Sequence, residues 1–195
     1  MLYVVSGFMR TGTSMMMRAL EGGGLEAVYA PGRDDMRKKY ADDQYDPNEG
    51  GLYELEREQY QAIDFPRAYD GKLIKCLNMG VVTMATMPDG IMCVFMRRDV
   101  EEIRQSYDAF FGKQLGMLDP DTFQRRMDLI YERIENRWDV ESLTELWYRN
   151  VVEYPLLAFA SMANQGWPID PEKAAAVVKP ELCRFRREEL TEGVL

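Results

Sequence analysis

Apolar residues occur along the chain in two patterns: short continuous runs, and longer stretches in which they recur every three or four positions. Short runs are typical of strands buried on both faces of a sheet. They predict strands over 2–7 (LYVVSG), 25–30 (LEAVYA), 71–78 (GKLIKCLN) and 89–99 (DGIMCVFMRRD).

The helical spacing predicts the other regular elements of the chain. Helices are expected over 13–24, 51–63, 100–111, 119–138, 139–154, 156–166 and 170–178, with room for a short strand between 139–154 and 156–166. Asp119 and Asp170 each precede a proline, a combination that favours a helix N-terminus. Gly22–Gly24 end the first helix, as glycine does at C-termini.

The alternation of strands and helices indicates an α/β protein. We expect three α/β/α layers around a mainly parallel central sheet, resembling P-loop NTPases. The length of 195 residues suits one domain, 1–195. Residues 31–51 are charged and poor in aliphatic side chains, which predicts a lid or flexible loop.

Composition and charge exclude several classes of function. A net charge of −9 opposes binding to nucleic acids or anionic membranes, and no apolar run approaches the length of a membrane span. No signal peptide is found, so a cytoplasmic protein is expected. Histidine is absent, which excludes histidine bases and ligands, and three cysteines without metal-ligand spacing predict reduced thiols. No metal site is expected.

The segment GFMRTGTS, from Gly7 to Ser14, links the first strand to the first helix. A glycine-rich turn in this position aims several backbone N–H groups at one point, and the helix N-terminus adds positive potential. It indicates a phosphate or sulfate site, although an ordinary strand–turn–helix junction can also contain glycines. The lysine of the Walker pattern is replaced by Thr13, and the loop cation is Arg10.

The loop cation, Arg10, stands before the second glycine and not after it. This position gives the loop a resemblance to a known family. Arg10, Thr11, Gly12, Thr13 and Ser14 resemble, in order, the 5′-phosphosulfate loop of the sulfotransferases. Met9 stands where that family usually has proline.

A second segment, FMRRDVEEIRQSYDAF, resembles the 3′-phosphate motif of the same family. Arg98 ends a strand and Ser106 follows eight residues later, with Tyr107 next. Arginine suits a two-point grip on phosphate, and the carboxyl edge of a parallel sheet is where ligands bind. Taken alone, the segment also fits a solvated helix start.

The resemblance implies a sulfotransferase that takes its sulfuryl group from 3′-phosphoadenosine 5′-phosphosulfate (PAPS). The loop residues with Arg10 would hold the 5′-phosphosulfate, and Arg98 with Ser106 would hold the 3′-phosphate. The acceptor is an unidentified hydroxyl or amine on a small molecule or peptide. The oligomeric state is not readable from the sequence.

Two further residues are candidates for catalysis. Segments around Glu54 and Lys75 resemble parts of bacterial sulfotransferase-like proteins, which suggests Glu54 as the base and Lys75 as a cation facing the site. Glu54 could equally be one exposed carboxylate in a glutamate-rich helix, and Lys75 a structural ion-pair partner. Arg184, Arg186 and Arg187 either cover the 3′-phosphate or form a solvated tail.

Two rival functions fit parts of the same pattern. A P-loop nucleotide or small-molecule kinase would need a metal-binding aspartate at a strand end, and Asp99 follows two arginines there. A catalytically inactive nucleotide-binding relative would keep the fold without the chemistry.

Overall fold

The computed structural model describes residues 1–30, 51, 53–111, 119–180 and 183. Its centre is a four-stranded sheet in the order β2-β1-β3-β4, and every pairing is parallel. The strands are β1 (Leu2–Gly7), β2 (Leu73–Lys75), β3 (Ile91–Arg97) and β4 (Val140–Trp147). All seven residues of β3 are buried, which agrees with the continuous apolar run that predicted this strand.

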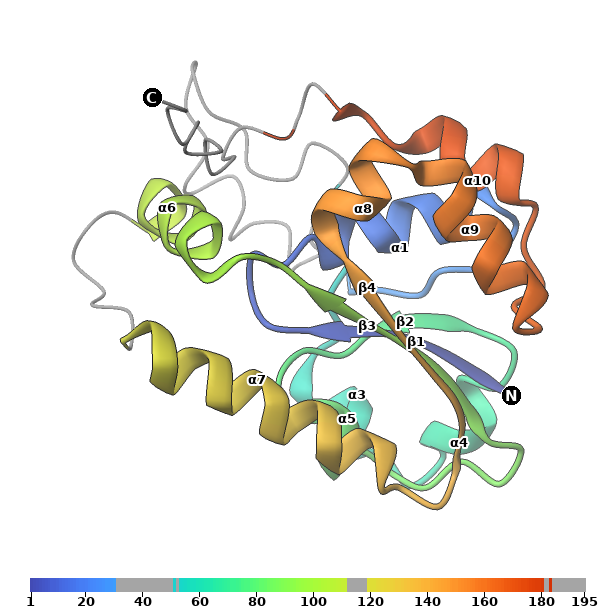
Figure 1. Cartoon of the computed structure of the whole chain (residues 1–195). Coiled ribbons are helices and arrows are strands. Elements are labelled where there is room, and N and C mark those ends of the chain that lie inside the picture. Colours follow the sequence, from blue (N-terminus) through green and yellow to red (C-terminus); the bar gives the residue numbers. More distant parts are fainter. Residues whose placement is uncertain (31–50, 52, 112–118, 181–182, 184–195) are drawn as a thin grey trace, which may run out of the picture.

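Helices cover both faces of the sheet (Figure 1). One face carries α1 (Thr13–Gly22), α8 (Tyr148–Glu153), α9 (Pro155–Asn164) and α10 (Pro171–Val177). The other carries α3 (Arg57–Tyr60), α4 (Phe65–Ala68), α5 (Gly80–Thr83) and α7 (Pro120–Glu135). The predicted parallel α/β fold with helices on both sides of the sheet is therefore confirmed.

Strand residues alternate between the two apolar layers. Val5 and Val94 pack in the cluster that contains α1 and α9, whereas Val4 and Phe95 pack in the cluster on the α7 side. This alternation is the period of two that a strand imposes on its side chains.

The carboxyl ends of β1 and β3 lie side by side, because Gly7 pairs with Met96 in the parallel register. The loop from β1 to α1 therefore lies next to the turn from β3 to α6 (Val100–Phe111). The central strand order thus brings together the two segments that carry the sequence motifs.

The prediction of one helix over 139–154 is wrong. Residues Val140–Trp147 form edge strand β4, and only Tyr148–Glu153 are helical. The segment VESLTELW has helix-forming residues with helical spacing, but its pairing with β3 along the register Ile91–Arg97 overrides that local preference.

Other local predictions are partly confirmed. Residues 25–30 contribute a single bridge, Ala27 to Leu73, in place of a strand, and the helix expected over 51–63 is limited to Arg57–Tyr60. Asp119 and Asp170 cap α7 and α10 as predicted, by accepting backbone N–H bonds.

In the described part of the chain, no helix has the length and apolar character to cross a membrane. Residues 31–50, which make up nearly all of the segment predicted to be a lid or flexible loop, lie outside the described residues.

Candidate functional site

The glycine-rich loop turns sharply between β1 and α1. Gly7 and Gly12 have φ angles of 141° and 94°, and Arg10 has a φ of 69°. The Thr11 hydroxyl donates a hydrogen bond to the Phe8 carbonyl at 2.7 Å, which closes the turn. Glycine favours positive φ, so Gly7 and Gly12 fit their backbone conformations, whereas Arg10 adopts a left-handed conformation that is uncommon for a residue other than glycine.

Gly12 also has a neighbour that excludes any side chain. A Cβ at this position would lie 2.3 Å from Cδ2 of Tyr148, at the start of α8. Position 12 therefore requires glycine for two independent reasons, its φ and the packing of the Tyr148 ring. The loop amides and the N-terminus of α1 form the kind of backbone site that binds anions.

Lys75 brings a buried cation to the start of α1. Its Nζ donates to Ser14 Oγ at 3.2 Å and lies 3.4 Å from Glu54 Oε1. Its side chain is 2% exposed, against 26% for Glu54. Lys75 is the last residue of β2, and a parallel bridge to Glu54 places the two side chains together. A buried ammonium therefore lies beside the start of α1, although the loop itself contains no lysine.

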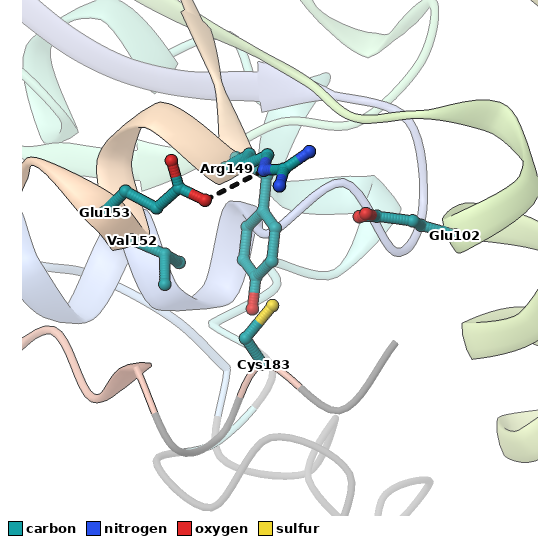
Figure 2. Close-up of a pocket in the computed structure, with 6 residues that line it drawn as sticks. Glu102, Arg149, Val152, Glu153 and Cys183 are labelled. Carbon is teal, nitrogen blue, oxygen red and sulfur yellow. Dashed lines mark hydrogen bonds and ion pairs between the residues drawn. The ribbon is translucent and has the colours of Figure 1, made fainter. Parts of the chain in front are cut away.

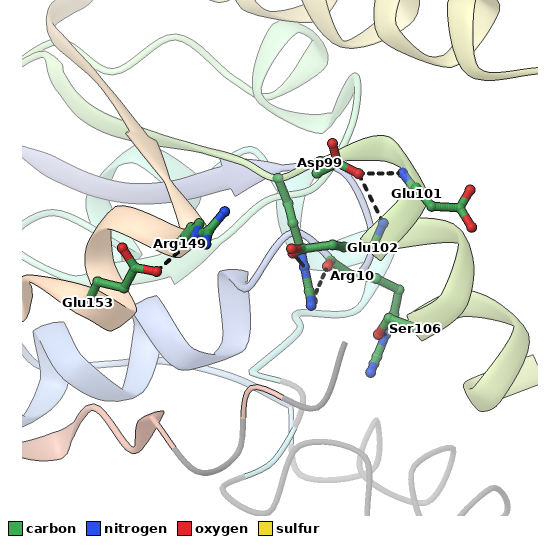
Figure 3. A network of polar contacts seen from close by, with 8 residues as sticks. Arg10, Asp99, Glu101, Glu102, Ser106, Arg149 and Glu153 are labelled. Atoms are coloured by element: carbon green, nitrogen blue, oxygen red, sulfur yellow. Dashed lines mark hydrogen bonds and ion pairs between the residues drawn. The ribbon is translucent and has the colours of Figure 1, made fainter. Parts of the chain in front are cut away.

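On the other side of the loop, the two sequence motifs meet. Arg10 Nε donates to Ser106 Oγ at 3.0 Å, and Arg98 Nη1 donates to the Arg10 carbonyl at 3.3 Å (Figure 3). Arg98 and Ser106 are 6% and 2% exposed. The structure therefore brings Arg10, Arg98 and Ser106 together, as the sequence predicted for one site.

Arg98 has two further neighbours that the sequence analysis missed. Its Nε donates to Glu102 Oε2 at 2.9 Å, and its Cζ lies 4.3 Å from the centre of the Tyr148 ring. Such a position over an aromatic face is a cation–π contact. The spacing of four residues between Arg98 and Glu102 was a signal for their pairing, whereas nothing local indicated Tyr148.

A small pocket opens beside this arginine, between α6 and α8 (Figure 2). It is lined by Glu102, Tyr148, Arg149, Val152, Glu153 and Cys183. Burial is the main cause that raises the pKa of the Tyr148 hydroxyl, and nearby Cys183 adds to the shift, so Tyr148 stays protonated at neutral pH.

Asp99 caps helix α6. Its Oδ1 accepts backbone N–H bonds from Glu101 at 2.9 Å and Glu102 at 3.3 Å (Figure 3). In the part of the chain that the structure describes, no group of three or more acidic, cysteine or histidine residues could hold a metal ion. The carboxylate that the kinase hypothesis would use for metal binding is instead a helix cap.

Arg97, the residue before Arg98, points to the opposite layer. Its Nε donates to Glu145 Oε2 at 3.0 Å, Nη1 pairs with Asp128 on α7, and Cζ lies 5.3 Å from the centre of the Tyr131 ring. These contacts join β3, β4 and α7. The two consecutive arginines therefore have different roles, since only Arg98 reaches the loop.

The three cysteines were predicted to be reduced thiols. The cysteines form no disulfide, and burial raises the pKa of Cys76 to about 12 and that of Cys93 further, so both remain thiols. Met16 and Met17 are fully buried in the core. Arg184, Arg186 and Arg187 lie outside the described residues.

Comparisons with known proteins do not assign a family. No family model matches the chain, and no curated protein matches it. A solved structure with a related arrangement is the unliganded crystal structure of a sugar kinase from Janibacter sp. HTCC2649. The two chains are 16% identical over 91% of this chain and 97% of the kinase, with a TM-score of 0.44. Likeness at this level carries no inference about function.

Proposed function

We propose that the chain is a sulfotransferase that uses PAPS and forms one domain of that type. The observation that carries this proposal is the contact between Arg10 Nε and Ser106 Oγ at 3.0 Å. It joins the loop that resembles a 5′-phosphosulfate site to the segment that resembles a 3′-phosphate site. Two motifs 96 residues apart thus meet in one place, at the edge of the sheet where ligands bind.

The loop side fits the 5′ end of the cofactor. The backbone N–H groups at the start of α1 would face a bound anion, Thr13 and Ser14 would add hydroxyls, and Lys75 has a buried positive charge beside Ser14. When bound, PAPS supplies the sulfuryl group that is transferred to the acceptor. Lys75 and the N-terminus of α1 would stabilise negative charge at the loop, and Arg10 would do so from its other side.

The opposite side fits a second anionic group. Arg98 is a buried guanidinium, and Ser106 lies on the first helix after its strand. Arginine binds phosphate through parallel N–H donors, and a serine hydroxyl adds a further donor. Arg98 and Ser106 would therefore select a nucleotide that carries a 3′-phosphate.

Glu54 is the candidate base for the acceptor. It is the more exposed partner of the ion pair with Lys75, so an acceptor hydroxyl or amine can approach its carboxylate from solvent. A base must lie within hydrogen-bond reach of the proton that it removes, and Glu54 lies beside the loop through Lys75. We propose a small molecule or peptide as the acceptor.

The position of Lys75 also favours a second candidate function. A lysine at the start of the first helix is the cation that P-loop kinases use on the β- and γ-phosphates. A kinase that draws this lysine from β2 is therefore the alternative. The use of Asp99 as a helix cap counts against it, because a kinase of this type needs a carboxylate for magnesium.

Calorimetric titration distinguishes these functions. The ligands are adenosine 3′,5′-bisphosphate, ADP, and ATP with Mg²⁺, and the proteins are the wild type and Arg98→Ala. We expect metal-independent binding of the bisphosphate that is tighter than binding of ADP. Arg98→Ala should weaken it about 10- to 100-fold, since a hydrogen bond to a charged group contributes about 1.5–3 kcal/mol.

Arg104→Ala is the matched control, because Arg104 lies on α6, the helix that follows Arg98, with its side chain 48% exposed and paired with Glu101. Its affinity should equal that of the wild type. Full affinity in Arg98→Ala would contradict the assigned 3′-phosphate site, and preference for ATP with Mg²⁺ would favour the kinase. Binding of the bisphosphate without transfer to any acceptor would indicate an inactive relative.

A further inference from the structure

Glu102 forms an ion pair with the guanidinium of Arg98, which the proposed function assigns to the 3′-phosphate. Its Oε2 accepts from Arg98 Nε at 2.9 Å, and both side chains are 7% exposed. Glu102 lies between Arg98 and Ser106 along the chain, on the same helix as Ser106. A carboxylate therefore stands inside the proposed phosphate site.

An anion that binds Arg98 must compete with the carboxylate of Glu102. Nη1 donates to the Arg10 carbonyl at 3.3 Å, and the Tyr148 ring lies against the guanidinium. These two contacts orient the arginine and contribute no full negative charge. Glu102 is an anionic partner of Arg98, so an incoming phosphate must displace it or lie beside a like charge.

The pocket between α6 and α8 lies next to the Arg98–Glu102 pair. Glu102 is part of its wall, and the guanidinium of Arg149, which pairs with Glu153 at 2.8 Å, lines the same pocket (Figures 2 and 3). Rotation away from Arg98 would bring the carboxylate toward the wall that contains Arg149 and Glu153.

We propose that Glu102 sets the affinity of this site, as an internal competitor that weakens the binding of nucleotides carrying a 3′-phosphate. This inference rests on the proposed function. Glu102 holds Arg98 in the ligand-free protein and yields it only to a ligand with enough anionic character. Ligands that lack the 3′-phosphate do not compete for Arg98, so Glu102 leaves their affinity unchanged.

The test is titration of Glu102→Gln with adenosine 3′,5′-bisphosphate and with ADP. The glutamine keeps an acceptor for Arg98 and removes the negative charge. Affinity for the bisphosphate should rise about tenfold, because juxtaposed like charges are strongly unfavourable in a buried site, and affinity for ADP should stay the same. Glu101→Gln is the matched control, since Glu101 is the preceding residue and its partner is the exposed Arg104. It should change neither affinity.

The outcomes separate this inference from the proposed function. A wild type that prefers the bisphosphate over ADP, with equal or weaker binding in Glu102→Gln, would overturn the role of Glu102 alone. No preference for the bisphosphate in either protein would overturn both. If Glu102→Gln does not fold, Glu102→Asp withdraws the carboxylate from Arg98 and should raise bisphosphate affinity by a smaller factor. An unchanged or lower affinity there would equally overturn the role of Glu102.

Discussion

Two arginine–carboxylate pairs are buried at opposite edges of the sheet, and their surroundings differ. Arg98 and Glu102 follow β3 at the carboxyl edge, next to the glycine-rich loop. Arg137 and Asp139 precede β4 at the amino edge, where Arg137 also donates to the carbonyls of α5 and the turn after it. Those carbonyls belong to Val81, Val82, Met84 and Ala85.

Backbone groups surround the Arg137–Asp139 pair at the amino edge. Besides the two bonds from Arg137, Asp139 accepts the Met87 N–H at 2.9 Å, and its side chain is 1% exposed. The carboxyl-edge pair borders a pocket and a loop with anion-binding geometry. The same two residue types therefore join backbone segments at one edge and, at the other, hold the cation that we assign to the proposed phosphate site.

The largest effect is expected at the amino edge. Asp139→Ala should lower the free energy of unfolding by about 3–5 kcal/mol, because it leaves Arg137, which is only 12% exposed, without its carboxylate and the Met87 N–H without an acceptor. Urea denaturation measures this loss. Affinity for adenosine 3′,5′-bisphosphate should be unchanged in the folded variant. A loss below about 1 kcal/mol, the level of an exposed ion pair, would show that the pair contributes little to the fold.

A matched pair of arginine-to-lysine substitutions sharpens the contrast. Arg137→Lys should cost about 2 kcal/mol of stability, since one ammonium cannot reach the carbonyls and the carboxylate that the planar guanidinium joins. Arg98→Lys should cost less stability but weaken bisphosphate binding about tenfold, because it loses the two-point grip. Thermal melts and calorimetry measure the two properties. Equal effects of both variants on ligand affinity would remove the distinction between the edges.

The smallest effect is the pH dependence of the amino-edge pair. Burial alone would raise the pKa of Asp139, but hydrogen bonds from Arg137 and the Met87 N–H outweigh it, so the pKa is lowered from 3.8. A carboxyl group with a lowered folded-state pKa stabilises the protein above its unfolded value of 3.8, and this contribution is lost as the pH falls through the folded pKa. Urea denaturation from pH 6 to pH 3 should show a shallower decline in Asp139→Asn than in the wild type. Parallel curves would contradict this account.

The parts of the fold and of the candidate site that depend on local sequence were predictable. The turn at Gly7 and Gly12 follows from glycine conformations, and the caps at Asp119 and Asp170 follow from residues that precede a proline. The meeting of Arg10 with Ser106 depends on the pairing of β1 with β3. The family resemblance assigned both motifs to one cofactor, but no strand order was predicted from the sequence.

The parts that depend on distant segments were not predictable. Tyr148 reaches the loop only because β4 lies beside β3, and the sequence predicted a helix in place of that strand. An eight-residue segment rich in glutamate and leucine has a local preference for helix, and only the open edge of β3 makes it a strand. The pairing of Glu102 with Arg98 was visible as a spacing of four, but its burial was not.

The Tyr148 ring lies against both Gly12 and Arg98, and this position links the sequences of two distant segments. A larger residue at position 12 becomes compatible with the fold only when position 148 is also reduced in size. The same reduction would remove the ring beneath Arg98. Substitutions at 12, 98 and 148 should therefore be strongly non-additive, and a library that varies all three together would reach active sequences that single replacements cannot.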